Sequence, residues 1–411
     1  MSGGGLIPVA EALSRVLASA REPLAEELTP LSEAFGRTLA REALALRTQP
    51  PFDNSAMDGY ALRAADAASA GARLEVVGES AAGRAFAGRV EAGQATRIFT
   101  GAPMPGGADA VAIQEQARRE GASVTLTNRV AQGENVRTRG FDFVEGEVLL
   151  AAGLRLTPRD VALAAAANHP ALWVRRRPRV AILATGDELV APGETPGPDQ
   201  IVASNSLSVA GVVLAAGGVP LDLGIAGDEP AALAQGVARA REAGADVLVT
   251  LGGASVGDHD LVQRTLIDAG MELDFWRIAM RPGKPLMHGR LGAMRVLGLP
   301  GNPTSSTVCA LLFLRPLLRA LAGDPQAGAD LSEPARLAVS LEANAVRQDY
   351  LRATLTRDGD GALLATPIAT QDSSLVKALA RADALIVRAP HTSAASAGEA
   401  CRIIRLEPLG A

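Results

Sequence analysis

The sequence predicts a multi-domain protein in which a central, mostly parallel α/β domain is joined to two all-β regions. Apolar runs alternate with helical segments over residues 178–326, and this alternation is typical of βαβ units. Short strands separated by glycines occupy residues 49–143 and 327–411, which is the pattern of small barrels and sandwiches. A chain of 411 residues also exceeds the size of one ordinary core. We therefore expect several domains.

The first region is a predicted helical scaffold made of residues 1–48 and 144–177. Residues Val9–Ala20 and Leu31–Ala45 carry apolar side chains at helical spacing, so each is predicted to form a helix. Residues Leu154–Ala167 form a third predicted helix, which begins at a Thr-Pro pair. We expect these helices to serve as scaffold or dimer contacts, because nothing in them indicates chemistry.

The inserted β domain, residues 49–143, contains short predicted strands and three polar loops. The loops carry Asp58, Thr100 and Asp142, each close to a glycine that indicates a turn. Turn chemistry alone explains an aspartate in such a loop, and a binding role is the alternative. The predicted strands are Leu74–Val77, Gln94–Phe99, Ala110–Glu115 and Ser123–Thr127, followed by Val148–Leu150.

The central domain, residues 178–326, alternates strands with helices, so we expect a mostly parallel sheet with helices on both faces. In sheets of this kind, ligands bind beyond the carboxyl ends of the strands. The predicted strands are Val180–Ala184, Val219–Ile225, Val247–Leu251 and Leu273–Ile278. The predicted helices are Asn205–Ala216, Pro230–Ala243, Leu261–Ala269 and Thr304–Leu321.

The stretch Ala245–Asp260 carries the strongest signal for a site in this domain. A buried strand runs into a glycine-rich turn, and two carboxylates stand where the next helix begins. Such a turn is an anion cradle, but two carboxylates repel a bare phosphate unless a divalent cation lies between them. The stretch therefore indicates either a metal-assisted phosphate or oxyanion site, or a tight βα turn with an aspartate cap. Its chemistry-bearing residues are Gly252, Gly253, Ser255, Asp258 and Asp260.

Four other loops meet the same edge of the predicted sheet. Of the five loops, three carry acids and two carry rigid Pro-Gly turns, one of which holds Lys284, a rare lysine in a chain rich in arginine. Rigid turns hold backbone N–H groups in place without an entropy cost on binding. A capped βα turn explains each loop alone, and the joint pattern weakens that interpretation. The loops are Thr185–Glu188, Gly227–Pro230, Met280–Pro285 and Leu299–Thr304.

The C-terminal domain, residues 327–411, is predicted to be a small β-barrel or sandwich that follows a Pro- and Ala-rich linker. Its polar loop Gln371–Ser374 is explained by an ordinary surface loop when it is taken alone. The predicted strands of this domain are Arg336–Leu341, Leu351–Leu355, Ala362–Pro367, Ala384–Val387 and Cys401–Arg405.

The overall composition argues against several classes of protein. The net charge of −5 argues against general nucleic-acid binding, and the 48% hydrophobic content is that of a folded protein. Arginines interrupt the strongest apolar run, Cys309–Leu321, so we expect neither a membrane span nor a secretory signal, and a cytoplasmic location. Cys309 and Cys401 lack metal-type spacing and the four histidines are scattered, so neither a histidine metal site nor a Ser-His-Asp triad is expected.

Six motifs stand out when the chain is taken as a whole. They are PPFDNSAMDGYA (50–61), FTGAPMPGGADAV (99–111), ATGDEL (184–189), LGGASVGDHD (251–260), RPGKP (281–285) and LGLPGNP (297–303). Each motif is weak alone, but their order and spacing cover nearly the whole chain. Together they resemble the molybdopterin molybdenumtransferases, the enzymes that insert molybdate in the last step of molybdenum-cofactor synthesis.

The resemblance implies an elongated homodimer of four-domain subunits, with a molybdopterin-binding-like central domain. The active site would lie between the central domain of one subunit and the Asp58-bearing region of the other.

The resemblance also implies roles for residues of this chain. The catalytic candidates, of which the first two come from the partner subunit, are Asp58, Asp142, Glu188, Asp228, Asp260 and Lys284. The candidate Mg²⁺ ligands are Glu188, Asp228, Asp258 and Asp260. The candidate substrate-binding residues are Thr100, Gly186, Asp187, Gly252, Gly253, Ser255, Arg277, Arg281, Pro300, Asn302, Pro303 and Ser373.

The implied reaction takes adenylylated molybdopterin, cleaves its phosphoanhydride using Mg²⁺, inserts molybdate at the dithiolene sulfurs and releases AMP. Molybdopterin adenylyltransferase and proteins that load molybdoenzymes are the expected partners, and no nucleic acid or membrane is expected. One alternative is the sibling adenylylation of molybdopterin, but that enzyme usually lacks the 50–150 insert and the β tail. The other is a non-catalytic pterin-binding scaffold, against which the intact set of acids argues.

The sequence departs from the family pattern at a few positions. Arg277 and Arg281 stand where lysines are common in the family, and the positive charge is preserved. Asp372 replaces a usual glycine, and Lys377 and Ala378 replace a pair of serines, so the contribution of the tail to the site is an open question. Residues 201–205 lack the usual acid, and we assign no role to that turn.

Overall fold

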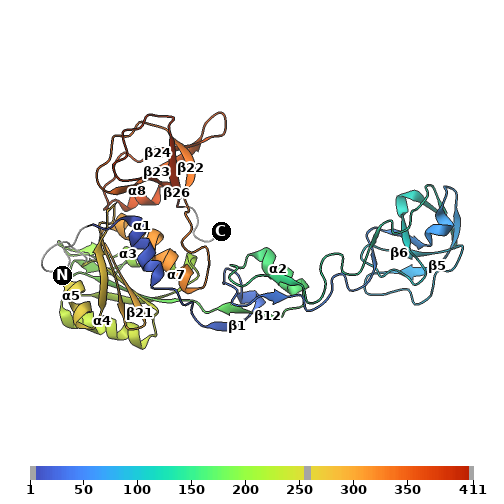
Figure 1. Cartoon of the computed structure of the whole chain (residues 1–411), viewed down its shortest axis with the longest axis horizontal. Helices are drawn as coiled ribbons and strands as arrows, with labels where there is room; N and C mark the ends of the chain where they lie inside the picture. Colours follow the sequence, from blue (N-terminus) through green and yellow to red (C-terminus); the bar gives the residue numbers. More distant parts are fainter. Residues whose placement is uncertain (1–5, 254–260, 407–411) are drawn as a thin grey trace. The chain divides into compact units, whose positions relative to one another are not determined.

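The computed structural model describes residues 6–253 and 261–406, which fall into two compact units (Figure 1). Each unit has a hydrophobic core of its own. The central unit comprises Met1–Glu27, Gly36–Ala40 and Trp173–Ala411. The inserted unit comprises Leu28–Phe35 and Arg41–Leu172.

A six-stranded mixed sheet lies at the centre of the central unit. Its strands are β13 (Arg179–Thr185), β16 (Val219–Ala226), β17 (Val247–Leu251), β18 (Glu272–Arg277), β20 (Pro285–Leu291) and β21 (Met294–Leu299). Their order across the sheet is β16-β13-β17-β21-β20-β18. The first four are parallel neighbours, with Leu248 on β17 opposite Ala181 on β13 and Val296 on β21. β20 is antiparallel to both β21 and β18.

Helices cover both faces of this sheet, as the alternation predicts. The helices are α1 (Val9–Ala18), α3 (Asn205–Ala215), α4 (Pro230–Glu242), α5 (Leu261–Asp268), α6 (Pro303–Cys309) and α7 (Arg315–Leu321). α1, α3, α6 and α7 share one core with Val249, while α4 and α5 share the other core with Leu248. Successive residues of a strand point to opposite faces, so β17 is buried along its whole length.

The longest helical segment belongs to this core. α6 and α7 are joined by the π-helical turn η4 (Ala310–Leu314), and Pro316 in the first turn of α7 lacks the N–H that would continue an α-helical ladder. The segment Pro303–Leu321 is long and apolar enough to cross a membrane, but 72% of its apolar window is buried inside the structure. It is therefore a core helix of the central unit.

The hairpin of β20 and β21 is absent from the strands that the sequence predicts. Gly289 and Gly298 break the apolar run, and His288 and Arg290 add polar side chains to it. β20 runs against β21, and β18 runs against β20, so β18 points in the same direction as the parallel strands. The carboxyl ends of all five other strands of the sheet therefore lie at one edge.

A small β-barrel follows the sheet, as predicted. Its strands are β22 (Glu333–Leu337), β23 (Gln348–Arg357), β24 (Leu363–Pro367), β25 (Ala384–Arg388) and β26 (Ala400–Arg405), joined by β19 (Met280–Arg281) and accompanied by α8 (Val376–Ala380). Their order is β19-β23-β24-β22-β26-β25, and the pairing of β23 with β25 closes the barrel. β19 precedes β20 in the chain and pairs with β23, so it ties the barrel to the central sheet.

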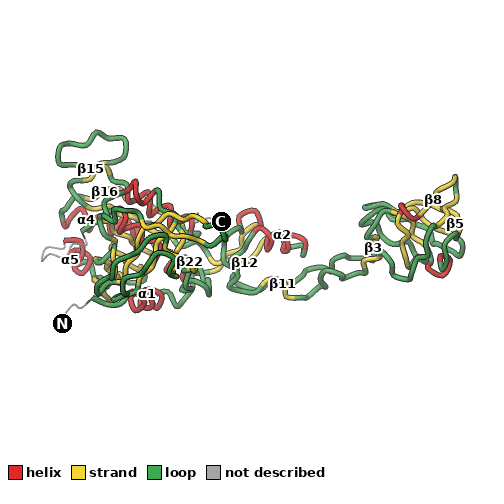
Figure 2. Tube along the Cα trace, turned by 90° about the horizontal axis from the view of Figure 1, so that it is seen from above, coloured by secondary structure: helices red, strands yellow, loops and turns green. Residues whose placement is uncertain are grey.

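The inserted unit is built mainly of strands and loops (Figure 2). Its six-stranded sheet has the order β7-β4-β6-β5-β9-β8. The strands are β4 (Gly59–Leu62), β5 (Arg73–Ser80), β6 (Gln94–Ile98), β7 (Ala110–Ile113), β8 (Ala117–Glu120) and β9 (Ser123–Leu126). Smaller elements are β2 (Ala43–Leu44), β3 (Asn54–Ser55), β10 (Val136–Arg137), β11 (Val148–Leu150), η2 (Ala64–Ala67), η3 (Gln114–Gln116) and α2 (Pro158–Ala166). β1 (Glu26–Pro30) and β12 (Ala171–Arg175) lie at the changeovers between the units.

The predicted helix over Leu31–Ala45 is wrong. Only the 3₁₀ turn η1 (Leu31–Glu33) forms there, and β2 follows. Gly36 has a left-handed backbone with φ of 68°, a conformation that ends a helix. Arg37 then donates a hydrogen bond to the carbonyl of Arg175 (2.8 Å), so a distant contact overrides the helical spacing of the apolar residues.

Candidate functional site

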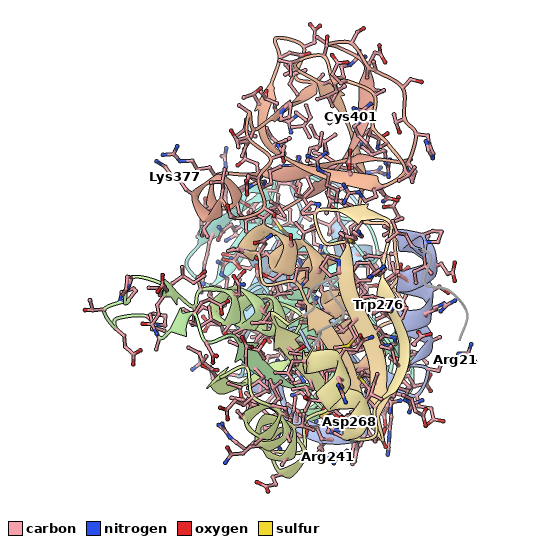
Figure 3. All side chains as sticks on the ribbon, turned by 90° about the vertical axis from the view of Figure 1, so that its left-hand side faces the viewer. Arg21, Arg241, Asp268, Trp276, Lys377 and Cys401 are labelled. Atoms are coloured by element: carbon pink, nitrogen blue, oxygen red, sulfur yellow. The ribbon has the colours of Figure 1, made fainter. Side chains whose placement is uncertain are left out.

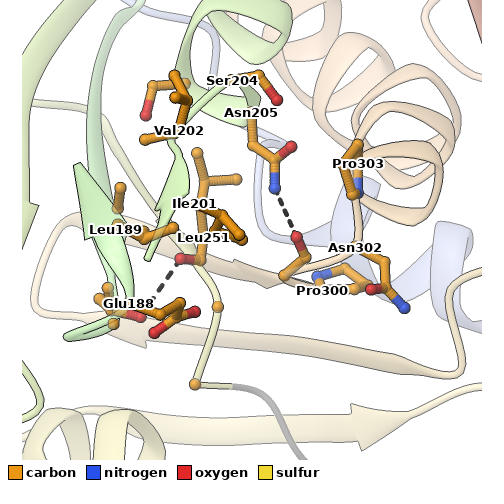
Figure 4. Close-up of a pocket in the computed structure, with 18 of the residues that line it drawn as sticks. Glu188, Leu189, Ile201, Val202, Ser204, Asn205, Leu251, Pro300, Asn302 and Pro303 are labelled. Atoms are coloured by element: carbon orange, nitrogen blue, oxygen red, sulfur yellow. Dashed lines mark hydrogen bonds between the residues drawn. The ribbon is translucent and has the colours of Figure 1, made fainter. Parts of the chain in front are cut away.

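The carboxyl ends of four central strands surround a pocket of about 1040 Å³ (Figure 4). β13, β16, β17 and β21 all lead into it, as expected for a sheet of this type. The short strands β14 (Leu189–Val190) and β15 (Ile201–Val202) and the start of α3 form further walls. The predicted site residues that line the pocket are Gly186, Glu188, Asp228, Gly252, Gly253, Pro300, Asn302 and Pro303.

Glu188 is held at the pocket by the turn that carries it. Gly186 has φ of 140°, and a Cβ atom there would overlap the carboxylate of Glu188. Glycine adopts this positive φ without strain, which accounts for its place in the turn before Glu188. The carbonyl of Glu188 accepts a hydrogen bond from Ile201 N (2.7 Å), which joins the turn to β15. The backbone is thus fixed while the side chain stays exposed.

Asp187 and Asp228 meet from two neighbouring strand ends. The N–H of Asp228 donates to Asp187 Oδ1 (3.0 Å), and a Cβ atom at Gly227 would lie 2.8 Å from the same oxygen. Asp187 therefore positions the loop that brings Asp228 to the pocket. Glu188 and Asp228 are the only charged side chains that line the pocket in the described part of the chain.

The glycine turn after β17 packs directly on its neighbours. Gly252 and Gly253 have φ of 100° and 64°, and a Cβ atom at Gly252 would lie 2.7 Å from the carbonyl oxygen of Thr185. Gly252 N also donates to Leu299 O (3.2 Å), which joins two strand ends. The remaining predicted residues of this stretch lie outside the described residues, so their roles stay predictions: Ser255, Asp258 and Asp260.

The turn from Pro300 to Pro303 is tied to α3 by Asn205, a residue without a role in the sequence analysis. Asn205 Nδ2 donates to Gly301 O (2.6 Å; Figure 4), and the neighbouring Ser204 and Ser206 line the pocket with it. The one available signal is a Ser-Asn-Ser run at the start of a predicted helix, which more often indicates a helix cap. Its proximity to Gly301 is a property of the fold.

The C-terminal barrel contributes to the pocket through its polar loop. Asn302 Nδ2 donates to Ser373 Oγ (2.9 Å), and Thr304 N donates to Ser373 O (3.0 Å). Ser374 and Val376 line the pocket. Predicted residue Ser373 thus touches the turn that holds Asn302, and its neighbour reaches the pocket wall.

Arg352 on β23 is a residue of this site that the sequence does not reveal. It is 1% exposed, and its guanidinium donates to the carbonyls of Thr370 (3.1 Å), Asp372 (2.9 Å) and Leu375 (3.3 Å). It also donates to Thr304 Oγ1 at the start of α6 (3.3 Å). Burial lowers the pKa of Arg352, and the charge of Asp372 opposes that shift. Three of these acceptors lie on one loop and the fourth lies at the start of α6, so Arg352 holds the loop against α6.

The departures from the family pattern leave this loop intact. Asp372 Oδ1 accepts hydrogen bonds from the N–H (2.9 Å) and the hydroxyl (2.8 Å) of Ser374, and both lower the pKa of the Asp372 carboxyl. Lys377 is exposed and projects from α8 at the surface (Figure 3), while Ala378 is half-buried. The tail therefore takes part in the pocket wall despite these substitutions.

The predicted cationic residues do not line the pocket among the residues that the structure describes. Pro285 lines it, directly after Lys284. The guanidinium carbon of Arg277 lies 3.7 Å from the centre of the Trp276 ring, and Arg281 is exposed. The catalytic role of Lys284 and the substrate-binding roles of Arg277 and Arg281 stay predictions.

The remaining predicted acids belong to the inserted unit. Asp58 Oδ1 accepts hydrogen bonds from Thr100 N (2.7 Å) and Thr100 Oγ1 (2.8 Å). These two bonds, the backbone bond first, hold the pKa of the Asp58 carboxyl below its usual value, and the charge of Arg97 adds to them. Asp142 is exposed, and its N–H donates to Gln49 O (3.0 Å).

The donors at the pocket suit a metal that arrives with a phosphate. The described residues hold no group of three His, Cys, Asp or Glu side chains that would bind a metal without other ligands. Glu188 and Asp228 nevertheless both line the pocket. Mg²⁺ is usually bound through one or two carboxylates together with water and substrate phosphates. This pair therefore fits Mg²⁺ better than a metal that needs a complete protein cage.

Models of known families match successive parts of the chain. The model of the MoeA N-terminal region (domain I and II) matches residues 7–168. The probable molybdopterin binding domain matches residues 181–320, which contain the sheet and most of the pocket. The model of the MoeA C-terminal region (domain IV) matches residues 334–406.

Full-length relatives agree with these models. The molybdopterin molybdenumtransferase of Haemophilus influenzae is 33% identical over 399 residues, which cover 97% of this chain and 98% of the relative. That of Bacillus subtilis is 34% identical over 408 residues, with coverage of 97% and 94%. A crystal structure of the molybdopterin biosynthesis MoeA protein from Pyrococcus horikoshii superposes with a TM-score of 0.83 at 30% identity, covering 98% of this chain and all of that one. The chain therefore belongs to the MoeA family of molybdopterin molybdenumtransferases.

Proposed function

We propose that this enzyme inserts molybdate into adenylylated molybdopterin and releases AMP, the last step of molybdenum-cofactor synthesis. The curated relatives carry the name molybdopterin molybdenumtransferase. The observation that supports the proposal most is the pocket at the carboxyl edge of the sheet, within the part that matches the molybdopterin-binding model. Its volume of about 1040 Å³ is large enough for a ligand of nucleotide size.

The walls of the pocket offer different chemistry on its two sides. Leu189, Ile201 and Val202 lie on one side, and Asn205 and Asn302 lie on the other (Figure 4). Apolar side chains suit a planar ring, and amide side chains suit the polar groups of a pterin, a ribose or a phosphate. The residues of the chain thus bind and orient a substrate that combines rings with a phosphoanhydride.

We propose Mg²⁺ as the cofactor, with Glu188 and Asp228 as ligands and Asp258 and Asp260 as further candidates. Bound there, Mg²⁺ would neutralise the phosphoanhydride and help AMP to leave. Two carboxylates without a cation would repel the substrate. Asp228→Asn should therefore weaken the Mg²⁺ dependence of turnover, while Asp199→Asn, on an exposed loop, should leave it unchanged. A Mg²⁺ titration that is the same for both variants would remove Asp228 from the site.

We also propose a homodimer, in which Asp58, Thr100 and Asp142 of one subunit serve the pocket of the other. Asp58 is half-buried, and the two hydrogen bonds from Thr100 favour the ionised form of its carboxylate, so we infer that it acts on a group outside its own domain. Apolar side chains beside these acids are exposed as well, Met57 by 43% and Phe141 by 71%. Exposed apolar side chains next to polar ones are typical of a surface that a partner covers.

The proposed location is the cytoplasm, where Cys309 and Cys401, both free thiols, would stay reduced. The proposed protein partners are molybdopterin adenylyltransferase, which would supply the substrate, and proteins that load molybdoenzymes, which would take the product. The proposal includes no nucleic acid and no membrane.

Release of AMP from adenylylated molybdopterin, measured with Mg²⁺ and with or without molybdate, tests the proposed function. Release that depends on molybdate is the expected result. Release that ignores molybdate would make the protein a metal-dependent pyrophosphate hydrolase. Tight pterin binding without release would favour a scaffold, and formation of adenylylated molybdopterin from ATP would favour the sibling adenylyltransferase.

A further inference from the structure

We infer that Arg97 is a positioning residue that holds Asp58 and Thr100 of the inserted unit in their paired arrangement. The inference rests on the proposed function, in which Asp58 acts at the active site, but its evidence is the local geometry of the inserted unit. Arg97 lies on β6, directly opposite Tyr60 on β4. None of the motifs that indicate the family includes it.

The guanidinium of Arg97 lies close to two aromatic rings. Its central carbon is 5.3 Å from the centre of the Tyr60 ring and 4.8 Å from the centre of the Phe99 ring. The register explains both contacts, because Tyr60 is the cross-strand neighbour of Arg97 and Phe99 follows it by two residues on the same face. Tyr60 is only 6% exposed, so the first ring is fixed in the core. A planar cation is attracted to both ring faces.

The same guanidinium makes two hydrogen bonds that lead to Asp58. Arg97 Nη1 donates to the carbonyl of Gly59 (3.1 Å), the residue after Asp58. Arg97 Nη2 donates to Gln114 Oε1 (2.8 Å), and Gln114 N in turn donates to Asp58 O (3.0 Å). Arg97 therefore binds the residue after Asp58 directly and is linked to the Asp58 carbonyl through Gln114.

Thr100 is held from the same point. Phe99, whose ring contacts the guanidinium of Arg97, directly precedes Thr100, and Thr100 supplies both donors to Asp58 Oδ1. One side chain thus contacts the neighbours of both members of the pair. Asp58 and Thr100 lie on separate turns of the inserted unit. We therefore expect a movement of Arg97 to change the distance between them.

The charge of Arg97 is also available to Asp58. In the described part of the chain, no carboxylate forms an ion pair with Arg97, and its partners are a carbonyl, an amide and two rings. Its charge lowers the pKa of the Asp58 carboxyl, after the two bonds from Thr100. The other nearby acid, Glu115, accepts a hydrogen bond from the Gln114 amide (3.3 Å). Arg97 therefore both shapes the pair and favours its ionised form.

The direct test is the titration of the Asp58 carboxyl in the full-length protein, followed by carbon-13 NMR with labelled aspartate. Asp58→Asn identifies the signal by its loss. Arg97→Gln should shift the midpoint of the Asp58 titration upward, and Arg97→Lys should shift it less because it keeps the charge. The matched control is Arg84→Gln, since Arg84 is exposed in the same unit and pairs with Glu79 (2.9 Å).

Equal midpoints in Arg97→Gln and Arg84→Gln would overturn the inference, because a purely structural arginine would change stability without moving this titration. Arg97→Lys carries the same comparison if Arg97→Gln does not fold. The second readout is turnover, which Arg97→Gln should lower through kcat by up to about 100-fold, since small misplacements of a catalytic group have effects of this size. Full turnover in Asp58→Asn would instead refute the proposed role of Asp58 and would leave the titration to decide on Arg97.

Discussion

The pocket of the central unit and the Asp58–Thr100 pair of the inserted unit hold their acids in different ways. In the pocket, Glu188 and Asp228 are placed through the backbone, by the positive φ of Gly186 (140°) and by the hydrogen bond from Asp228 N to Asp187 Oδ1 (3.0 Å). Asp58 is instead held through its own carboxylate, which accepts two hydrogen bonds from Thr100. A backbone turn fixes the place of an acidic residue whether or not its carboxyl is ionised. Hydrogen bonds to a carboxylate, in contrast, make the position of that group depend on its ionisation. The central unit therefore sets geometry, and the inserted unit sets geometry and charge together.

The largest expected effect comes from removing that charge. Asp58→Asn keeps the size of the side chain but loses the ionised carboxylate, so we expect turnover to fall by about 100- to 1000-fold, as when one electrostatic group of an active site is lost. The folded structure should survive, because Asp58 is only half-buried and the amide of asparagine can still accept the hydrogen bonds from Thr100. AMP release and thermal unfolding measured on the same sample check both halves of the prediction. A variant that unfolds would show that the role of Asp58 is structural.

The second prediction tests the part of the pocket wall that the side chain of Arg352 holds in place. Arg352→Met keeps the aliphatic part of the side chain but removes the buried guanidinium that donates to three loop carbonyls and to the hydroxyl of Thr304. We expect a loss of about 3 kcal/mol in the free energy of unfolding, because hydrogen bonds to a charged group contribute about 1.5–3 kcal/mol each and several are lost together. Urea unfolding measures it. The control is Arg357→Met on the same strand, where the arginine is exposed and donates to Gly361 O (2.7 Å); equal losses would show that the buried bonds do not matter.

The third prediction tests the part of the pocket wall where Gly252 packs against the end of β13. Gly252→Ala places a Cβ atom 2.7 Å from the carbonyl oxygen of Thr185, at a φ of 100° that alanine adopts only under strain. We expect the free energy of unfolding to fall by about 1–3 kcal/mol more than in Gly193→Ala. Gly193 has a similar φ of 97° but nothing within reach of the added atom. Similar losses in the two variants would mean that backbone strain, and not the close approach of β13 and β17, accounts for the effect.

The difference between the two regions also explains what the sequence predicts well. β17 and α3 fall within a residue of their predicted bounds, because apolar and β-branched residues repeat with the period of a buried element. The β20–β21 hairpin is absent from the prediction, because Gly289 and Gly298 interrupt the apolar pattern where the strands pack closely. The Leu31–Ala45 segment has helical spacing, but the left-handed turn at Gly36 decides its structure.

The site shows the same division. Glu188 and Asp228 follow strands whose ends the sequence locates, so their meeting at one pocket could be predicted from topology. Asn205 and Arg352 could not be predicted, since each acts on a partner far away in the chain, such as Gly301 for Asn205. Motifs mark residues that are unusual in composition, whereas an arginine within a mixed strand such as β23 gives no sign of the loop that it holds.

The smallest expected effect separates charge from position within the Asp58 pair. Thr100→Val removes the hydroxyl donor and keeps the backbone N–H, which is the larger cause of the lowered pKa of Asp58, so that pKa should rise only part of the way. A carboxyl whose pKa is lowered by folding stabilises the protein above its unfolded pKa, and this contribution is lost as the pH falls through the folded value. The acid limbs of stability and of turnover should therefore both move to higher pH in Thr100→Val. At neutral pH, Thr100→Val should therefore be slightly less stable than the unchanged protein, and this difference should shrink as the pH falls below the unfolded pKa. Turnover at neutral pH should stay close to that of the unchanged protein, because Asp58 remains ionised there.

Thermal unfolding and AMP release, followed from neutral pH down to about pH 3, measure these limbs. Thr125→Val is the control, because Thr125 lies on β9 of the same unit, away from Asp58 in the strand order. Acid limbs that coincide in the two variants would mean that the hydroxyl does not act on Asp58. A shift of the turnover limb without a shift of the stability limb would place the effect in the proposed site between subunits, where further groups would surround Asp58. The two limbs together thus report whether the inserted unit sets the charge of Asp58 before or only after it meets the pocket.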